Sequence, residues 1–235
     1  NIAPKSITPE IFENRITRDL WITGYFNIIS GKEIPDHLKA SYLYHDQVNP
    51  VRFKRVGAEF ILAVSAGISN NNLSIEYHLY DVAMNKEIAA QGLNGSLKTI
   101  DRIFHRFENK IIYYITGSDG VFDTKLAFVS TRTGNKEIYT IDFDGRHLRR
   151  VTRNGSINLS PKWSPNGQKI SFTSFIRRNP DLYVIDLIHG KIRLLSHQTG
   201  LNAAPAWSPD GHHIALTMRT RTGSEIFLVN TKGKK

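Results

Sequence analysis

The chain has 235 residues, no cysteine and a formal net charge of +10. The lack of cysteine excludes disulfides, thiolate metal sites and a cysteine nucleophile, and no apolar run of about 18 residues is long enough to span a membrane. The positive charge favours an acidic partner. Because the sequence opens on Asn1 without an initiator Met, we expect a processed or trimmed product whose signal peptide has been removed.

The hydrophobic periodicity changes near residue 118 and predicts two domains. Residues 1–118 mix helical and alternating patterns, which predicts a small α+β domain. Residues 119–235 alternate with a period of two, which predicts an all-β domain. The expected fold class is therefore an α+β domain followed by a β-propeller.

The start of the first domain has a clear helix signal. Thr8 is a suitable N-cap, and apolar residues at helical spacing follow it until Gly24. A short apolar run at 26–29 predicts a strand, and residues 31–58 are polar enough to predict mostly loop.

The rest of the first domain predicts a sheet and a second helix. Strands are expected at 60–64, 73–79 and 87–91, with a hairpin turn at Asn85 and Lys86. A wide apolar stripe between Leu97 and Tyr114 predicts a helix of about 20 residues that ends at Gly117. We expect two helices over a small mixed sheet, with Tyr77 and Tyr114 in its core.

The second domain contains a repeat with a period of 44 residues. Such a period with several strand-like pieces is typical of a β-propeller blade. Within one unit, four short strands are expected at 158–163, 168–174, 181–187 and 191–196. The repeat carries two Trp-Ser-Pro turns, formed by Trp163, Ser164, Pro165, Asn166 and Gly167 and by Trp207, Ser208, Pro209, Asp210 and Gly211.

These turns predict structural roles. Pro fixes φ at the second turn position, and Gly supplies the left-handed one. Trp163 and Trp207 are expected to pack between adjacent blades. Asp142 and Asp186 recur after the third strand, where a carboxylate accepts hydrogen bonds from turn amides.

The sequence indicates no catalytic, metal or cofactor site. It has no G-x-S-x-G elbow, Walker loop, G-x-G-x-x-G or H-E-x-x-H motif. His212 and His213 are adjacent on a strand and point to opposite faces, which disfavours a shared metal ion. The basic residues are either solvated blade loops or a partner-facing surface, for which the candidates are Arg149, Arg150, Arg177 and Arg178.

The motifs resemble the TolB family, the periplasmic component of the Tol-Pal system. The family's N-x-x-P-x-W-S-P-D-G repeat is matched at 158–167 and again at 202–211, and the stretch from Ile115 to Val129 resembles its entry into the first blade. The resemblance implies an N-terminal α+β domain and a six-bladed propeller of WD40-like repeats. Six units would need about 264 residues, and about 115 follow the junction here. We therefore expect a fragment, trimmed at both ends.

The resemblance also implies a function. TolB-like proteins are non-enzymatic periplasmic scaffolds that maintain outer-membrane integrity and invagination during cell division. They bind the peptidoglycan-associated lipoprotein (Pal) through the propeller and TolA through an N-terminal tail, which would precede residue 1 here. Some are exploited by colicins. They are peripheral to the outer membrane through these partners.

Two other classes remain as alternatives. The chain is alternatively the propeller of a serine peptidase whose catalytic domain lies beyond residue 235, which a downstream G-x-S-x-G segment would favour. A basic nucleic-acid-binding module is a third class, and it predicts oligonucleotide binding that weakens steeply with salt. We expect no nucleic-acid partner, because exposed base-stacking aromatics are not evident beside the basic residues.

Overall fold

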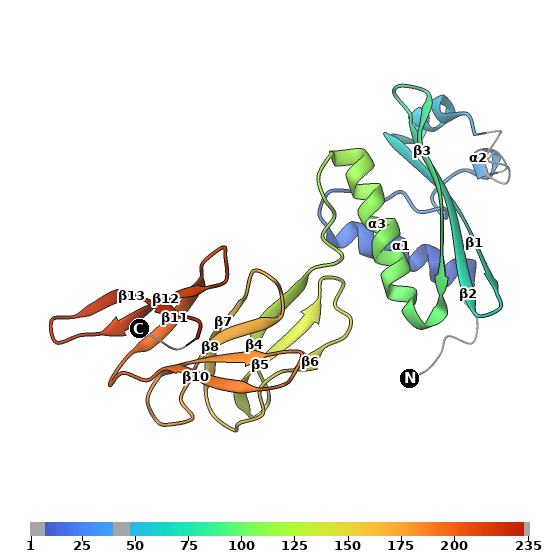
Figure 1. The fold of residues 1–235 in the computed structure, drawn as a ribbon. Helices are drawn as coiled ribbons and strands as arrows, with labels where there is room; N and C mark the ends of the chain where they lie inside the picture. Colours follow the sequence, from blue (N-terminus) through green and yellow to red (C-terminus); the bar gives the residue numbers. More distant parts are fainter. Residues whose placement is uncertain (1–7, 40–47, 233–235) are drawn as a thin grey trace. The chain divides into compact units, whose positions relative to one another are not determined.

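The computed structural model describes residues 8–39 and 48–232. The chain divides into two compact units, Asn1–Thr124 and Lys125–Lys235 (Figure 1). The first unit combines helices with a sheet, and the second contains three antiparallel sheets. The predicted fold class, an α+β domain followed by part of a β-propeller, is confirmed.

Helix α1 (Pro9–Ile22) begins at the predicted cap. The Thr8 hydroxyl accepts a hydrogen bond from the Ile11 amide at 3.3 Å, which satisfies one of the free donors of the first turn. The helix ends at Ile22, and Gly24 follows with a positive φ of 74°. Its buried face consists of Phe12, Ile16 and Leu20.

The segment after α1 differs from the prediction. Residues 26–30 form no strand, although Phe26 and Ile28 pack against the apolar core. An apolar run becomes a strand only where a neighbouring strand is available for pairing. The predicted loop over 31–58 contains a short helix α2 (Asp36–Lys39) and a 3-10 helix η2 (Pro50–Val56), and its residues 40–47 lie outside the described part.

The sheet of the first unit has the order β1-β2-β3. Its strands are β1 (Phe60–Ser69), β2 (Asn72–Asp81) and β3 (Lys86–Ser96), and both pairings are antiparallel. The prediction of a mixed sheet is therefore wrong. Tight turns at Asn70–Asn71 and Asn85, all with positive φ, join consecutive strands and impose the antiparallel direction.

Helices α1 and α3 cover one face of this sheet (Figure 1). Helix α3 (Ile100–Thr116) follows a 3-10 turn η3 (Leu97–Thr99) and ends at Gly117, as predicted. Tyr77 is fully buried against it, and burial raises the pKa of this phenol to about 12. The expectation for Tyr114 is wrong: it is 38% exposed, because the buried face of the helix includes Ile112 instead.

The second unit consists of three sheets, here called blades 1, 2 and 3 (Figure 1). All four predicted strands are present in blade 2, and each of their ends lies within one residue of the predicted end. Blade 1 contains β4 (Lys125–Thr133), β5 (Asn135–Asp142) and β6 (Arg149–Arg150). Blade 2 contains β7 (Asn158–Trp163), β8 (Lys169–Ser174), β9 (Asp181–Asp186) and β10 (Ile192–Ser196), and blade 3 contains β11 (Asn202–Trp207), β12 (His213–Arg219) and β13 (Ser224–Asn230).

Equivalent positions of the repeat form the apolar core at each blade junction. Between blades 1 and 2 the buried residues are Ile138, Ile170, Phe172, Tyr183 and Ile185. Between blades 2 and 3 they are Leu182, Val184, Ile214, Leu216, Met218 and Val229. Trp163 packs against the first cluster and Trp207 against the second. Blade 2 thus turns one apolar face to blade 1 and the opposite face to blade 3.

Candidate functional site

The strand order places two different sets of connections at the two ends of the blades. One end carries the loops after β4, β8 and β12 and the connections that lead into β7 and β11. The other end carries the Trp-Ser-Pro turns and the turns after β5 and β9. A partner that approaches one end therefore meets side chains from several blades at once.

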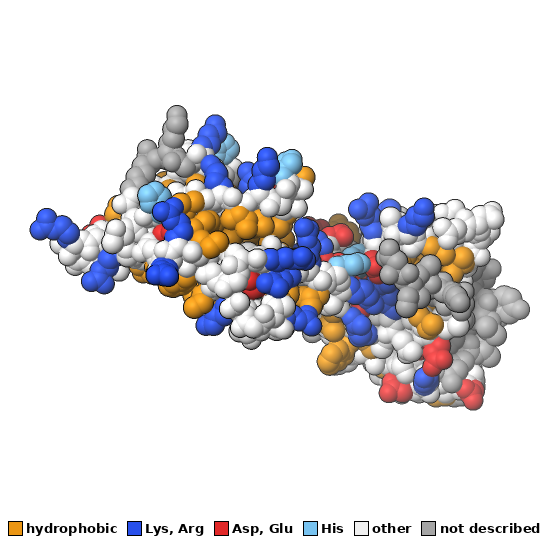
Figure 2. Space-filling view, turned by 90° about the horizontal axis from the view of Figure 1, so that it is seen from below, with side chains coloured by type: hydrophobic (Ala, Val, Ile, Leu, Met, Phe, Trp, Pro, Cys, Tyr) orange, Lys and Arg blue, Asp and Glu red, His pale blue; other side chains and the backbone are white. Residues whose placement is uncertain are grey.

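The first end is basic, and we call it the arginine rim. Its connections at 151–157, 175–180, 197–201 and 220–223 contain no Asp or Glu. Its arginine side chains belong to exposed residues, so the positive charge is available to a partner. The arginine rim consists of Arg132, Arg153, Arg177, Arg178, Arg219 and Arg221. Blue Lys and Arg side chains are also widely spread in the space-filling view, whereas red side chains occupy small spots (Figure 2).

A repeated asparagine holds the connections of this rim. The Asn202 amide donates to the carbonyl oxygens of Gln198 (2.6 Å) and Gly200 (3.0 Å), and its oxygen accepts from Ser196 Oγ (2.8 Å). Asn158 occupies the same position one repeat earlier and donates to the Ser156 carbonyl at 3.2 Å. Both asparagines are fully buried. The connections at 151–157 and 197–201 are therefore held in place, and Asn179 ties the 175–180 loop to the second of them by donating to the Gln198 carbonyl and accepting from the Gly200 amide, each at 3.0 Å. Loops that are ordered before a partner binds lower the entropic cost of docking.

A buried carboxylate further orders the rim beside blade 1. Glu137 is fully buried and accepts hydrogen bonds from Arg150 Nη2 (2.9 Å), the Gly155 amide (3.2 Å) and Asn158 Nδ2 (3.0 Å), as well as from the Thr152 hydroxyl. These contacts compensate the burial of the charge. Sequence analysis missed Glu137. The one available signal is that the repeat places another acid, Asp181, at the equivalent position.

The structure separates the four arginines proposed to face a partner. Arg177 and Arg178 lie together in the β8–β9 loop, where Arg178 adopts a positive φ of 65°. Arg149 and Arg150 lie on the outer strand β6, paired with Thr140 and Tyr139 of β5. The Arg150 guanidinium is bound to Glu137. The accessible positive charge of the rim therefore comes from Arg177, Arg178 and their neighbours on other loops.

The opposite end carries the Trp-Ser-Pro turns, which have the same geometry in both copies. The Gly167 amide donates to the Ser164 carbonyl, and the Gly211 amide donates to the Ser208 carbonyl, each at 2.9 Å. Both glycines have a positive φ, 68° and 71°. Such turns set the angle between the first two strands of a blade. The structure thus places Trp163, Ser164, Pro165, Gly167, Trp207, Ser208, Pro209, Asp210 and Gly211 at the ends of strands β7 and β11.

The same end balances its charges with Asp–His contacts. Burial raises the pKa of Asp142, but hydrogen bonds from Lys125 and His147 (2.7 Å) outweigh this effect and hold the pKa below its usual value. The His189 amide and side chain lower the pKa of Asp186 in the equivalent turn. Because acids and bases are paired here, this end offers less uncompensated charge than the arginine rim.

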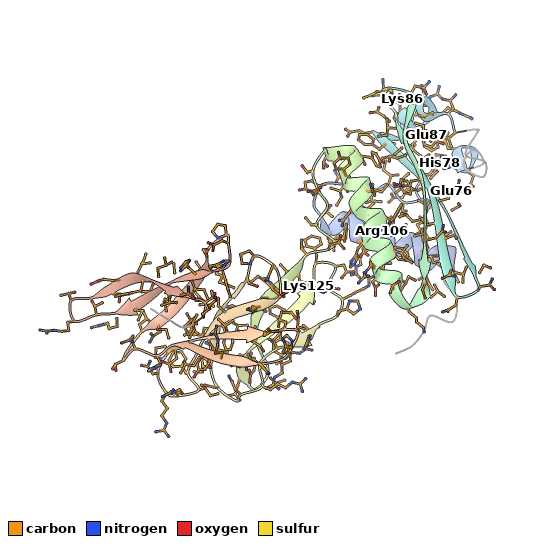
Figure 3. All side chains as sticks on the ribbon, in the orientation of Figure 1. Glu76, His78, Lys86, Glu87, Arg106 and Lys125 are labelled. Atoms are coloured by element: carbon orange, nitrogen blue, oxygen red, sulfur yellow. The ribbon has the colours of Figure 1, made fainter. Side chains whose placement is uncertain are left out.

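Other polar clusters indicate no chemistry. In the first unit, His78 lies between Glu87 and Glu76, with nitrogen–oxygen distances of 3.3 and 3.7 Å (Figure 3). Among residues 8–39 and 48–232, no group of three or more His, Cys, Asp or Glu side chains is arranged to hold a metal ion. None of the helices within these described residues is long and apolar enough to cross a membrane.

Comparison with known families decides the identity of the fold. Residues 6–88 match the family described as the TolB amino-terminal domain, and residues 113–235 match the TolB beta propeller domain. The chain belongs to the TolB family. Both halves match in the order in which the family joins them, so the relationship does not depend on the widespread blade repeat.

Individual relatives agree with this assignment. The Tol-Pal system protein TolB of Geobacter sulfurreducens is 38% identical over 118 residues, which cover 50% of this chain and 27% of that protein. The protein of the same name from Desulfosudis oleivorans is 35% identical over 152 residues, or 63% of this chain and 34% of the relative. The alignments thus span about a third of these relatives or less.

A solved structure confirms the fold over nearly the whole chain. The crystal structure of TolB from Acinetobacter baumannii superposes with a TM-score of 0.81 and 24% sequence identity, covering 94% of this chain and 55% of that one. The likeness includes the α+β unit as well as the blades. At this identity it supports the architecture and not the partner contacts.

Proposed function

We propose that this protein is a non-catalytic component of the Tol-Pal system that binds an acidic protein surface through the arginine rim. Membership of the TolB family carries the proposal, because the matching relatives are named Tol-Pal system proteins. The rim supplies the physical basis: several exposed arginines on fixed loops, without a neighbouring acid in those loops, favour and orient a negatively charged partner.

The proposed partners are those of the Tol-Pal system. The peptidoglycan-associated lipoprotein is the candidate for the rim, and TolA, which the family binds through an amino-terminal tail, is the second proposed partner. Colicins are proposed competitors for the same surfaces. In this role the protein acts in the periplasm as a scaffold that links partners at the outer membrane and helps that membrane follow cell division.

Charge reversal on the rim tests the proposal. The chain is mixed with the soluble part of the lipoprotein from the same organism, and affinity is measured calorimetrically at about 50 mM and about 300 mM salt. The double variant Arg177→Glu/Arg178→Glu should bind at least about tenfold more weakly at low salt. Its affinity should also depend less on salt, because fewer opposite charges meet at the interface.

The matched control reverses two charges at the opposite end. Lys191→Glu/Lys232→Glu changes the net charge by the same amount, and both residues are exposed. It should bind nearly as well as the parent chain. Equal losses in both variants would mean that only total charge matters, and unchanged binding in the rim variant would exclude the rim. Absence of binding by the parent chain would exclude the lipoprotein as a partner of these blades.

A further inference from the structure

One end of the sheet in the first unit carries a cluster of cations. The cations come from the 3-10 helix η2 and from the turn that joins β2 to β3, and all of them belong to exposed residues. They are Arg52, Lys54 and Arg55 of η2 and Lys86 at the start of β3. Figure 3 labels Lys86 at this end of the sheet. We call the surface formed by residues 50–56 and 82–86 the basic tip.

Packing on one apolar cluster holds the two segments of the basic tip together. Phe53 of η2 and Val82 of the turn are buried in the cluster that also contains Ile61 and Tyr80. The Val82 amide donates to the Glu59 carbonyl at 2.9 Å. Figure 1 shows η2, in light blue, beside the end of the sheet where β3 begins. The cations of the two segments therefore lie at the same end of the first unit.

The 3-10 geometry of η2 separates its inward side chains from its outward ones. Residues three apart lie above one another in such a helix, so the side chains form three columns. The inward column is Pro50, Phe53 and Val56, and the outward columns are Val51 with Lys54 and Arg52 with Arg55. The anchor at Phe53 thus fixes the direction in which the cations point.

Two apolar side chains are exposed among these cations. Val51 is 49% exposed on η2, and Met84 is 67% exposed in the turn. The Met84 amide donates to Asp81 Oδ1 at 2.7 Å, which orders the backbone of the turn. Exposed apolar side chains that are flanked by Lys and Arg are typical of a surface at a membrane interface, where the cations meet anionic headgroups and the apolar groups reach the acyl boundary.

Few acids oppose the positive charge of the basic tip. Residues 50–58 and 82–86 contain no Asp or Glu. Of the acids that border them, Asp81 is buried and bound to the turn, and the Glu87 carboxylate lies 3.3 Å from His78 Nδ1. Glu59 is exposed. The four cations therefore leave a net positive charge at this end of the unit.

We propose that the basic tip docks on the anionic surface of a phospholipid bilayer, with Val51 and Met84 at the level of the headgroups. A specific protein interface takes about 20–30 residues from each partner, whereas η2 has 7 residues and the turn is shorter still. A bilayer accepts so small a surface, because its headgroups rearrange around it. The contact goes beyond the proposed function and does not use the arginine rim, which lies in the second unit.

Co-sedimentation with vesicles tests the proposal. The full chain is mixed with phosphatidylcholine vesicles that contain about 30% phosphatidylglycerol, and with pure phosphatidylcholine vesicles, at about 100 mM salt. The parent chain should sediment with the anionic vesicles only. Arg52→Glu/Arg55→Glu should bind them at least about tenfold more weakly, since each cation near an anionic surface changes the affinity about fivefold. Both side chains are exposed, so the melting temperature should not change.

The matched control reverses two charges of the arginine rim. Arg177→Glu/Arg178→Glu changes the net charge by the same amount and should keep most of the vesicle binding. Equal losses in the two variants would mean that only total charge attracts the chain to vesicles, which would overturn the proposal. The same outcome leaves the binding of the lipoprotein to the rim untouched, so the two proposals fail independently.

The absence of cysteine from the sequence permits a second measurement at the basic tip itself. Met84→Cys carries an environment-sensitive nitrobenzoxadiazole label on its single thiol. Its control is Ile188→Cys, at a residue of similar exposure, 65%, in the turn after β9. On anionic vesicles the emission of the label at position 84 should shift to the blue and rise about twofold. The label at position 188 should not respond.

Soluble glycerol phosphate separates a bilayer from a free phosphate group. At the phosphate concentration of the vesicles it should leave the label at position 84 unchanged, and an equal response to it would identify a phosphate site and overturn the proposal. A parent chain that does not sediment with anionic vesicles would leave the basic tip to an acidic protein, which also overturns it. So would a label at position 84 that does not respond to bound vesicles.

Discussion

Trp163 and Trp207 occupy the same position of the repeat, yet their indole N–H groups differ. Trp207 Nε1 donates to the Lys162 carbonyl at 3.2 Å. Trp163 Nε1 is buried and has no hydrogen-bond partner among the described residues. The contrast has a geometric cause. The Lys162 carbonyl that accepts from Trp207 belongs to β7, the first strand of blade 2. The described part of blade 1 begins with β4 and has no strand that corresponds to β7.

Replacement of each tryptophan by phenylalanine should therefore have unequal effects. Both variants keep an aromatic ring in the junction and lose a similar apolar area. Trp207→Phe also removes a hydrogen bond with a net contribution of about 1 kcal/mol. Trp163→Phe removes an unsatisfied buried donor, which relieves a desolvation cost of about 1–3 kcal/mol. We expect the free energy of unfolding of Trp207→Phe to be lower than that of Trp163→Phe by about 2–4 kcal/mol.

Urea unfolding measures this difference directly. The chain has three tryptophans, so in a Trp21→Phe background the single tryptophan left in each variant reports on the blades alone. The midpoint and slope of its fluorescence transition give the free energy of unfolding. If Trp163→Phe is as destabilising as Trp207→Phe, the Trp163 N–H has a partner in solution and the reasoning fails.

Three further predictions concern single residues. Gly120→Ala should lower the stability of the first unit by about 2 kcal/mol or more, because a Cβ there would lie 2.0 Å from Asn109 Oδ1. The control is Gly92→Ala, since nothing lies within 4 Å of a Cβ at that position. Equal melting temperatures of the two variants would contradict the prediction. Glu137→Gln should cost about 3 kcal/mol, since it leaves buried donors and an arginine without their carboxylate, and a loss below about 0.5 kcal/mol in urea unfolding would exclude this role. The lowered pKa of Asp142 stabilises the folded state above the ordinary carboxyl pKa of about 4, and this contribution is lost as the pH falls through the lower folded-state pKa. Asp142→Asn should therefore flatten the dependence of melting temperature on acidic pH, and an unchanged slope would count against the pairing.

The fold of the blades is predictable because each strand carries its own end signals. Ser-Pro-Asn-Gly and Ser-Pro-Asp-Gly mark one turn of each unit, and the 44-residue shift confirms the strands between turns. The first unit gives weaker signals. The run at 26–29 has strand-like composition, but whether it pairs depends on a neighbour that local sequence does not reveal.

The candidate site is only partly predictable, for a similar reason. Composition and spacing identify Arg177 and Arg178 as exposed loop residues. They do not show that Arg149 and Arg150 lie on a strand, because β6 has only two residues and weak alternation. The contact between Arg150 and Glu137 joins residues far apart in sequence, and only the strand pairing brings them together.

Whether a position is buried or exposed depends on how well the repeats agree in residue type at that position. Positions that keep their residue type across repeats, such as Ile170 and Ile214 or Asn158 and Asn202, are buried at junctions or hold the backbone. Most positions on the rim change: Arg153 is equivalent to His197, and Arg178 is equivalent to Gly134 and Thr222, although Arg177 is equivalent to Arg221. The repeat therefore specifies how blades stack, while the departures from it give each loop its own charge. Exchanging the 175–180 loop for the equivalent 131–136 segment keeps two basic residues but moves them to other positions. If a partner recognises the positions of these charges, the exchange should preserve folding and weaken binding, whereas unchanged affinity would mean that only the total charge of the loop matters.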